Sequence, residues 1–400
     1  MLPVDLPGTV RDALLAPLVD HHCHGVRRDD LSRAQFELLS GEGGSPSPPG
    51  TTHFDTPFGV AVRRWCAPLL DLEPHAPPAV YLARRTELGA GEVNRRLLAG
   101  AGVVAFLVDA SPDACADTHA DTHADSHAGF GADLDVLTAA EMGRHGGAAA
   151  DELVRIERIE RDVAATAELA VDYLDNLSDE LAARAARAVG LKTVIGARCG
   201  LDFDPARPSR GAVIAAANRR LADPKQPLTD HVLLRYLLWS AVDVARERGL
   251  PVQFHTGFGG QAGEPHRADP ARLSTFAAAL QPLGVPVILL HCYPYHRQAA
   301  HLAGVFPHVY VDVGLALPHG TAAAARIMDE LLELAPFHKQ LFSSGCRGLA
   351  ETGYLGALTY RRALAAALAA RISAGEWSTA DAARIAHMIG SGNARRVYRL

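Results

Sequence analysis

Two histidines near the start of the chain have the spacing of a metal-binding pair. His22 and His24 end a short stretch whose apolar residues, up to Val19, predict a buried strand. Side chains alternate between the two faces of a strand, so both imidazoles point the same way. Neutral imidazole is a common zinc ligand. A polar cluster in an N-terminal turn explains this pair equally well when the pair is taken alone.

The same setting recurs at two more positions. His255 closes the apolar run at residues 251–254, and His291 closes the apolar run at residues 287–290. A single histidine at a strand end is more often structural than functional. Four histidines at three strand ends are hard to attribute to coincidence, and they predict a divalent metal site.

Along the chain, short apolar runs alternate with helical or loop segments. This alternation predicts a parallel sheet, and eight such units predict an α/β fold of the (β/α)8 barrel type, in which the carboxyl ends of the strands carry the active site. An open doubly wound sheet is less well supported, because no G-x-G-x-x-G follows an early strand. The eight runs begin at Val19, Val103, Leu153, Val189, Val252, Val285, Val309 and Gln340.

Two segments interrupt this pattern within what we expect to be one domain, residues 1–400. Residues 27–100 are mostly helical and predict an insertion between the first two strands. Residues 112–131 contain a near-repeat that would place His119, His123 and His127 on one face if it were helical. Little in this stretch is apolar, so a solvated low-complexity insertion is the favoured interpretation.

Composition excludes several classes of protein. The chain has 400 residues, 48% hydrophobic and 21% charged, with a net charge of −6 and a pI near 6.3, which gives no electrostatic basis for binding nucleic acid. No apolar run approaches the length that spans a membrane. The start of the chain lacks the pattern of a signal peptide, and the six cysteines show no paired spacing. A cytoplasmic protein with reduced thiols is expected.

Seven segments, in order along nearly the whole chain, form a more specific pattern than the His-x-His pair alone. They are Val19–His24, Gly190–Thr193, Pro251–Gly259, Leu289–Tyr295, Tyr310–Gly314, Leu341–Gly356 and Gly392–Arg396.

This ordered set resembles the amidohydrolase superfamily, in the amidohydrolase-related branch that includes the N-terminal domain fused to glutamine-synthetase-like modules. The resemblance implies a distorted TIM barrel with the His-x-His on strand one and single histidines on strands five and six. By that mapping, His22, His24 and His255 are metal ligands. His291 is either a further ligand or a catalytic group that polarises the substrate.

The last strand departs from the family pattern. The family has a sequence resembling Ser-Ser-Asp there, whose aspartate touches the metal and handles the proton of the attacking water. Here Gly345 follows Ser343 and Ser344, and no aspartate lies between Gln340 and Glu351. Glycine offers neither a ligand nor a proton acceptor, so this departure puts activity in doubt.

Three more polar residues are candidates for the site. Lys192 lies on the expected fourth strand, and the resemblance implies either a carbamylated lysine that bridges two metals or a free lysine that binds a substrate carboxylate. Arg198 follows six residues later and could share substrate binding, or form a salt bridge on its loop. Glu351 could contact substrate, brace the loop, or lie exposed.

The sequence therefore predicts a metal-dependent hydrolase, most simply a zinc enzyme, that acts on a C–N (amide-type) or related bond of a small polar substrate. His291 and Lys192 are the expected catalytic residues. Two alternatives stay open: a metal-dependent decarboxylase of the same superfamily, and a catalytically impaired barrel that binds a ligand, which Gly345 favours. A small molecule is the only partner expected, and assembly into a homo-oligomer is left open.

Overall fold

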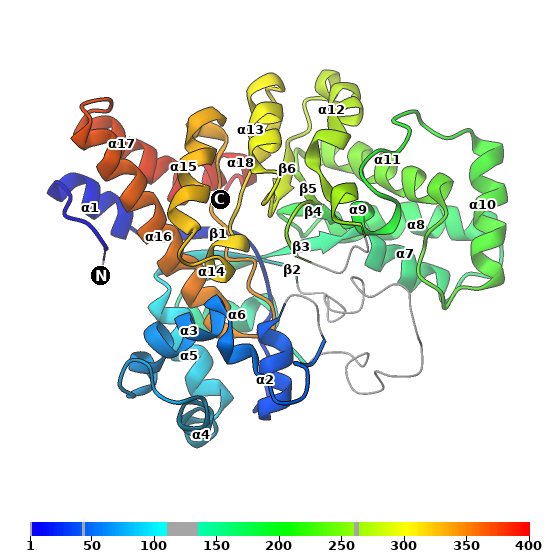
Figure 1. Ribbon diagram of the computed structural model, residues 1–400. Coiled ribbons are helices and arrows are strands. Elements are labelled where there is room, and N and C mark those ends of the chain that lie inside the picture. Colours follow the sequence, from blue (N-terminus) through cyan, green and yellow to red (C-terminus); the bar gives the residue numbers. More distant parts are fainter. Residues whose placement is uncertain (1, 42–44, 110–134, 260–263) are drawn as a thin grey trace.

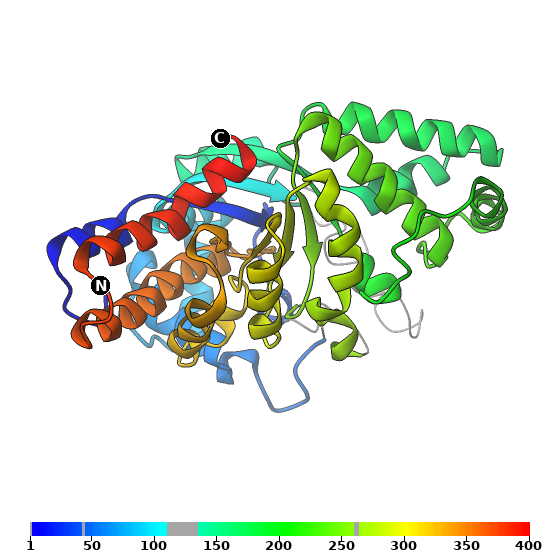
Figure 2. The same ribbon diagram turned by 90° about the horizontal axis from the view of Figure 1, so that it is seen from above.

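The computed structural model describes residues 2–41, 45–109, 135–259 and 264–400. Its centre is a parallel sheet of seven strands that follow one another in chain order and curl around a common axis (Figures 1 and 2). The strands are β1 (Leu18–His24), β2 (Val103–Asp109), β3 (Ala149–Arg155), β4 (Gly190–Thr193), β5 (Val252–His255), β6 (Val287–Leu290) and β7 (Val309–Val311).

The eighth predicted strand closes the ring without forming a regular strand. On one side, Leu341 N–H donates to the carbonyl of Val311 in β7, at 3.0 Å. On the other side, His21 N–H of β1 donates to the carbonyl of Phe342, at 3.1 Å. Residues 340–348 thus fill the gap between β7 and β1, and the predicted distorted (β/α)8 barrel is confirmed.

The barrel interior is apolar at the end where the strands begin. Val19 of β1 packs there with Ala105 of β2 and Ile288 of β6, and all three are buried. Helix α18 (Asn393–Tyr398) closes this end, because its Val397 and Tyr398 belong to the same cluster. The chain's last helix therefore acts as the floor of the barrel.

Helices cover the outside of the sheet. In Figure 1, α1, α16 and α17 gather on one side, while α8, α10 and α11 gather on the opposite side. Besides α18, the helices, including those just named, are α1 (Gly8–Leu15), α2 (Arg33–Ser40), α3 (Pro57–Ala61), α4 (Pro78–Leu88), α5 (Ala90–Gly100), α6 (Ala139–Gly146), α7 (Ile156–Ala164), α8 (Ala170–Ala185), α9 (Ile195–Cys199), α10 (Arg210–Ala222), α11 (His231–Arg248), α12 (Ser274–Leu280), α13 (His296–Val305), α14 (Ala316–His319), α15 (Ala324–Leu334), α16 (Ala350–Ser373) and α17 (Thr379–His387).

Short 3₁₀ and π segments connect several of these helices. They are η1 (His53–Asp55), η2 (Val62–Cys66), η3 (Ala67–Leu70), η6 (Pro265–Ala268), η7 (Pro270–Leu273), η8 (Gln281–Leu283), η9 (Phe337–Lys339) and η10 (Met388–Gly392).

Local sequence explains where the helices begin and end. Ser32 forms a capping box with Gln35 at the start of α2, and Asp230 accepts two backbone N–H groups at the start of α11. Gly249 ends α11 in the left-handed conformation, which glycine adopts without strain. The helical stretch that follows β3 is divided into two helices, α7 and α8, with a break at residues 165–169.

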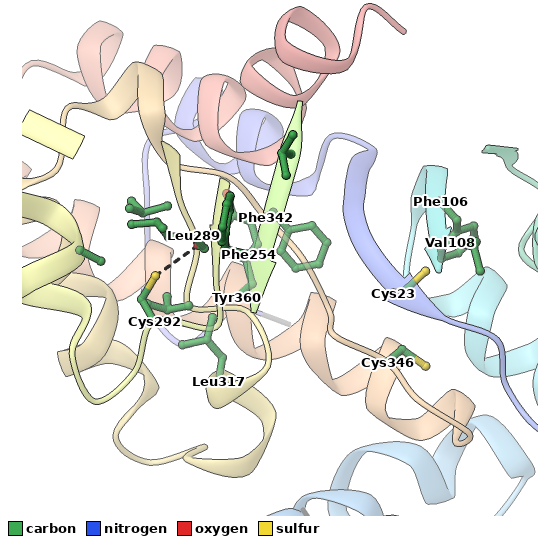
Figure 3. Packing of buried hydrophobic residues seen from close by; sticks show 14 of the residues in the cluster. Cys23, Phe106, Val108, Phe254, Leu289, Cys292, Leu317, Phe342, Cys346 and Tyr360 are labelled. Atoms are coloured by element: carbon green, nitrogen blue, oxygen red, sulfur yellow. Dashed lines mark hydrogen bonds between the residues drawn. The ribbon is translucent and has the colours of Figure 1, made fainter. Parts of the chain in front are cut away.

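The segment that replaces the eighth strand is anchored by an aromatic contact. Phe342 is buried and its ring lies 4.7 Å from that of Tyr360 in α16, between the sheet and the outer helix (Figure 3). Cys292 lies nearby and donates to the carbonyl of Leu289 at 3.2 Å. This packing fixes the backbone that leads to Gly345.

Two sequence-based predictions can be compared with the structure only as far as the described residues extend. The histidine repeat at residues 118–127 lies outside them. In the ranges that are described, no helix is long and apolar enough to cross a membrane.

Candidate metal and catalytic site

Four histidines meet at the carboxyl ends of the strands, as the sequence predicts. Their ring centroids form a chain: His24 lies 5.0 Å from His22, His22 lies 5.2 Å from His291, and His291 lies 5.3 Å from His255. His22 and His24 come from β1, His255 ends β5, and His291 directly follows β6. The barrel thus brings three distant parts of the chain into one row of imidazoles.

Lys192 lies between the first two rings. It is only 2% exposed, and its Nζ is 3.1 Å from Nε2 of His22 and 3.3 Å from Nε2 of His24. The same Nζ lies 3.1 Å from Oδ2 of Asp109. Burial lowers the pKa of Lys192 to about 8, although Asp109 opposes this shift. Lys192 is therefore part of the site itself.

Asp109 and Arg155 form a buried ion pair under these groups. Asp109 ends β2 and Arg155 ends β3, and the guanidinium contacts Oδ2 at 2.5 and 3.0 Å. Burial would raise the pKa of Asp109, but Arg155 and Lys192 hold that pKa well below its usual range. The site therefore contains one permanent carboxylate balanced by two cationic side chains.

His24 is held in one tautomer by the backbone. Its Nδ1 donates to the carbonyl of Asp109 at 3.2 Å, which leaves the lone pair of Nε2 directed at Lys192. Burial and then the charge of Lys192 lower the pKa of both His22 and His24 well below the usual value. Both rings are neutral, which is the form that binds metals.

His255 is turned towards its own loop. Its Nε2 lies 2.9 Å from the carbonyl of Gly259. Burial and the neighbouring His291 lower the pKa of His255 to about 3, so this ring is neutral too. His255 joins the row of rings, but its Nε2 is engaged by the backbone.

His291 is placed by a carboxylate in the next strand unit. Its backbone has a φ of +60°, an uncommon value for a non-glycine residue. Its N–H donates to Oδ1 of Asp312 at 3.1 Å, and Gly314 N–H donates to the same oxygen at 2.9 Å. The other oxygen, Oδ2, lies 2.7 Å from Nε2 of His21. Asp312 therefore fixes the strained turn that presents the His291 ring.

Gly345 adopts a conformation that suits glycine. Its φ is +60°, and a Cβ atom built on it would lie 2.8 Å from Leu315 Cβ and 3.1 Å from His291 Cε1. Its N–H donates to the carbonyl of His22 at 3.1 Å. Gly345 thus lies directly beside the row of histidines, where the resemblance places an aspartate, and the space for a side chain there is small.

Glu351 and Arg198 lie apart from these contacts. Glu351 is fully buried in α16, where it contacts Arg85 Nε at 2.7 Å and accepts from Tyr81 Oη at 2.8 Å. These contacts tie α16 to α4, and of the roles expected for Glu351 they match the bracing one. Arg198 lies in α9, directly after β4, and is partly exposed.

Sequence reasoning did not nominate Asp109, Arg155 or Asp312. Each stands at or just after the carboxyl end of a strand, the position that singled out His255 and His291. A polar residue that ends a buried apolar run was therefore a usable signal, and we applied it only to histidine.

The residues fit a divalent ion in chemistry but are not arranged around one. Within residues 2–41, 45–109, 135–259 and 264–400, no three His, Cys, Asp or Glu side chains form a finished metal site. The cause is visible at Lys192, whose Nζ lies where the Nε2 atoms of His22 and His24 converge. Neutral buried imidazoles beside a carboxylate are suitable zinc ligands, and Nδ1 of His22 is buried without a hydrogen-bond partner among the described residues. A metal ion held by the two Nε2 atoms requires Lys192 to take another position.

Comparisons with known proteins give a consistent picture. A family model described as Amidohydrolase matches residues 19–400. Protein fluG of Emericella nidulans is 31% identical over 223 residues, which is 53% of this chain and 26% of fluG, so the chain spans about a quarter of that relative.

Solved structures share the fold. A metal-dependent hydrolase of Lactobacillus casei, described as putative, superposes with a TM-score of 0.83 at 22% identity, covering 99% of this chain and 98% of that one. Uronate isomerase of Thermotoga maritima (TM-score 0.62, 12% identity, 98% and 97% coverage) and glucuronate isomerase of Caulobacter crescentus (0.63, 16%, 100% and 95%) are also similar. At these identities the similarity concerns the fold alone.

Proposed function

Because this chain belongs to the amidohydrolase family, we propose that it is a metal-dependent hydrolase that cleaves a C–N (amide-type) or related bond in a small polar substrate. The observation that carries the proposal is the row of four imidazoles at the carboxyl end of the barrel, in which His22, His24 and His255 have lowered pKa values. Neutral imidazoles are the form that ligates metals, and this end of a barrel is where active sites form.

In this proposal, His22, His24 and His255 hold the ion, most simply zinc. A divalent ion there would supply Lewis acidity and a water of lowered pKa. The second nitrogen of His24 already donates to a backbone carbonyl, which is the support that metal-bound imidazoles usually have. The donor set of this chain is therefore prepared for a metal on the His24 side of the site.

His291 and Lys192 are the proposed catalytic residues. The neighbouring Asp312 fixes the backbone of His291, so the ring is held beside His22 and can polarise the scissile carbonyl. Lys192 has two proposed roles: as a carbamylated side chain that joins the metal ligands, or as a free amine that binds a substrate carboxylate with Arg198. The contacts of Lys192 with His22 and His24 support the carbamylated form. Its ion pair with Asp109 supports the free, cationic amine.

A second function is favoured by one specific observation. No side chain at position 345 offers a carboxylate, and the φ of +60° and the contact with Leu315 disfavour adding one. A barrel that binds a small molecule without turning it over is the function this feature supports. The five cysteines in the described residues are free and buried, which supports a reducing, cytoplasmic place of action for either function.

Metal analysis combined with a turnover screen distinguishes the two functions. Purified protein is assayed for bound zinc, manganese and iron, and for hydrolysis of small amides, lactams and lactones. We expect His24→Asn to lose most of the bound metal, while the control His301→Asn, exposed in α13, keeps it. Metal with turnover supports the hydrolase, and metal without turnover supports the binding protein. Equal metal in both variants would refute this assignment of the ligands.

A further inference from the structure

A pocket lies at the end of the barrel opposite the histidines. Its volume is about 330 Å³. Gly249 precedes β5, Val285 and Pro286 precede β6, and Tyr310 belongs to β7, so this wall is made where strands begin. The opposite wall comes from α18, the floor of the barrel. The pocket is therefore separated from the histidine site by the length of the strands.

The charge of this pocket is wholly positive. Arg246 of α11, Arg396 of α18 and Arg399 line it, and its lining contains no Asp or Glu. Among the described residues, neither Arg246 nor Arg399 makes an ion pair, although most arginines of this structure do. Three guanidinium groups without a carboxylate stand out in a chain of net charge −6. Such a site attracts anions.

Arg399 is held in place by the backbone. It ends α18 with a φ of +58°, and its N–H donates to the carbonyl of Arg395. Its guanidinium lies directly against Gly249, where a Cβ atom would collide with it. Gly249 itself has a φ of +66° as the C-cap of α11, so one glycine both ends a helix and makes room for the arginine. Arg246, Arg396 and Arg399 are all exposed, so a ligand can reach their charges from solvent.

Tyr310 and Arg396 supply the remaining polar donors of the lining. The Tyr310 hydroxyl makes no hydrogen bond within the part of the chain that the structure describes, and its side chain is partly buried. Arg396 uses one nitrogen for the carbonyl of His338 at 2.5 Å, which leaves its other donors available. The pocket thus offers planar N–H donors and one O–H donor, the set that recognises phosphate and carboxylate oxygens.

We propose that this pocket binds a small polyanion, with at least two anionic groups, through Arg246, Arg396 and Arg399. The volume is at the lower end of the range for small-molecule sites, which excludes large cofactors and suits a phosphorylated or polycarboxylate metabolite. Phosphate esters and polycarboxylates share this chemistry. The site is independent of the metal and of the reaction proposed above.

Calorimetric titration of the full chain with pyrophosphate and, separately, with citrate tests the proposal. The lining variant is Arg246→Gln/Arg399→Gln. Its matched control, Arg248→Gln/Arg395→Gln, removes the same charge from exposed positions on the same two helices, outside the pocket. Thermal denaturation without ligand verifies that both variants are folded.

We expect at least one probe to bind the wild type, at least tenfold weaker binding to the lining variant, and binding within twofold of wild type for the control. A response to pyrophosphate alone assigns phosphate chemistry, and a response to citrate alone assigns carboxylate chemistry. Two results would overturn the proposal: no binding of either probe to the wild type, or equal weakening in both variants, which would mean that net charge alone is responsible.

Discussion

Replacing Gly345 by alanine should destabilise the protein through two separable effects. The first is the backbone: an L-residue at a φ of +60° costs about 1–2 kcal/mol. The second is the contact of the new Cβ with Leu315 Cβ at 2.8 Å, in a buried position where overpacking costs about 1–3 kcal/mol. The sum is about 2–5 kcal/mol.

A second glycine isolates the backbone effect. Gly375 has a φ of +73° and is exposed, with no atom within 4 Å of a built Cβ. Gly375→Ala should therefore cost only the first contribution, about 1–2 kcal/mol. The difference between the two variants measures the contact with Leu315 and the row of histidines.

Urea denaturation of the metal-free protein gives both values. The denaturation midpoint should fall for Gly375→Ala and fall further for Gly345→Ala, with the same dependence on denaturant. Equal midpoints for the two variants would show that the turn at Gly345 relaxes freely, and the geometry we describe would then not explain the absence of an aspartate there.

Gly345→Asp extends the same series to function. It should carry at least the cost of alanine, and its carboxylate would stand beside His291. If the chain lost a metal-binding aspartate at this position, bound metal should be higher in Gly345→Asp than in Gly345→Ala. Less metal in the aspartate variant, together with lower turnover, would show that the site is adapted to glycine.

Three further changes have defined outcomes. Glu351→Gln breaks a buried ion pair with Arg85 and should cost about 3–5 kcal/mol in urea denaturation; a loss below 1 kcal/mol would contradict the bracing role. Burial raises the pKa of Glu157, whose Oε2 has no hydrogen-bond partner in the described chain. As pH rises through that pKa, Glu157 ionises in the folded protein, and the stability of the wild type should fall relative to that of Glu157→Gln. Curves of unfolding free energy against pH that run parallel for the two proteins from pH 4 upwards would contradict this. Tyr398→Phe removes the hydroxyl that accepts from the Gln253 amide at 2.8 Å, and it should lower the free energy of unfolding in urea by about 1–3 kcal/mol. An unchanged denaturation midpoint would show that this hydrogen bond does not stabilise the fold.

Sequence periodicity accounts for much of this fold because parallel strands buried on both faces are nearly continuous apolar runs. β6, with the sequence Val-Ile-Leu-Leu, is the clearest example. The eighth strand was the weakest prediction, since Gly345 bends the backbone and the segment pairs through isolated hydrogen bonds. Its place in the ring depends on β1 and β7, which lie far away in sequence.

The candidate site was predictable as a set of strand-end residues, but its contacts were not. Alternation along β1 correctly placed His22 and His24 on one face. That Lys192 lies between them depends on the register of β4 relative to β1, which passes through two intervening strands. The pairing of Glu351 with Arg85 joins helices more than 260 residues apart, and no local pattern carries that information.

The closure of the barrel by α18 has a consequence for folding during synthesis. His21 and Tyr398, whose side chains lie 3.1 Å apart, are separated by 377 residues. At about 5–20 residues per second, roughly 20–75 s of synthesis pass between them. For most of that time, until residues 340–348 are made, the outer edge of β1 has no partner from its own chain. An unpaired edge of this kind is a template for wrong pairing, so the nascent chain is exposed to mispairing until residues 340–348 complete the ring and α18 packs under it.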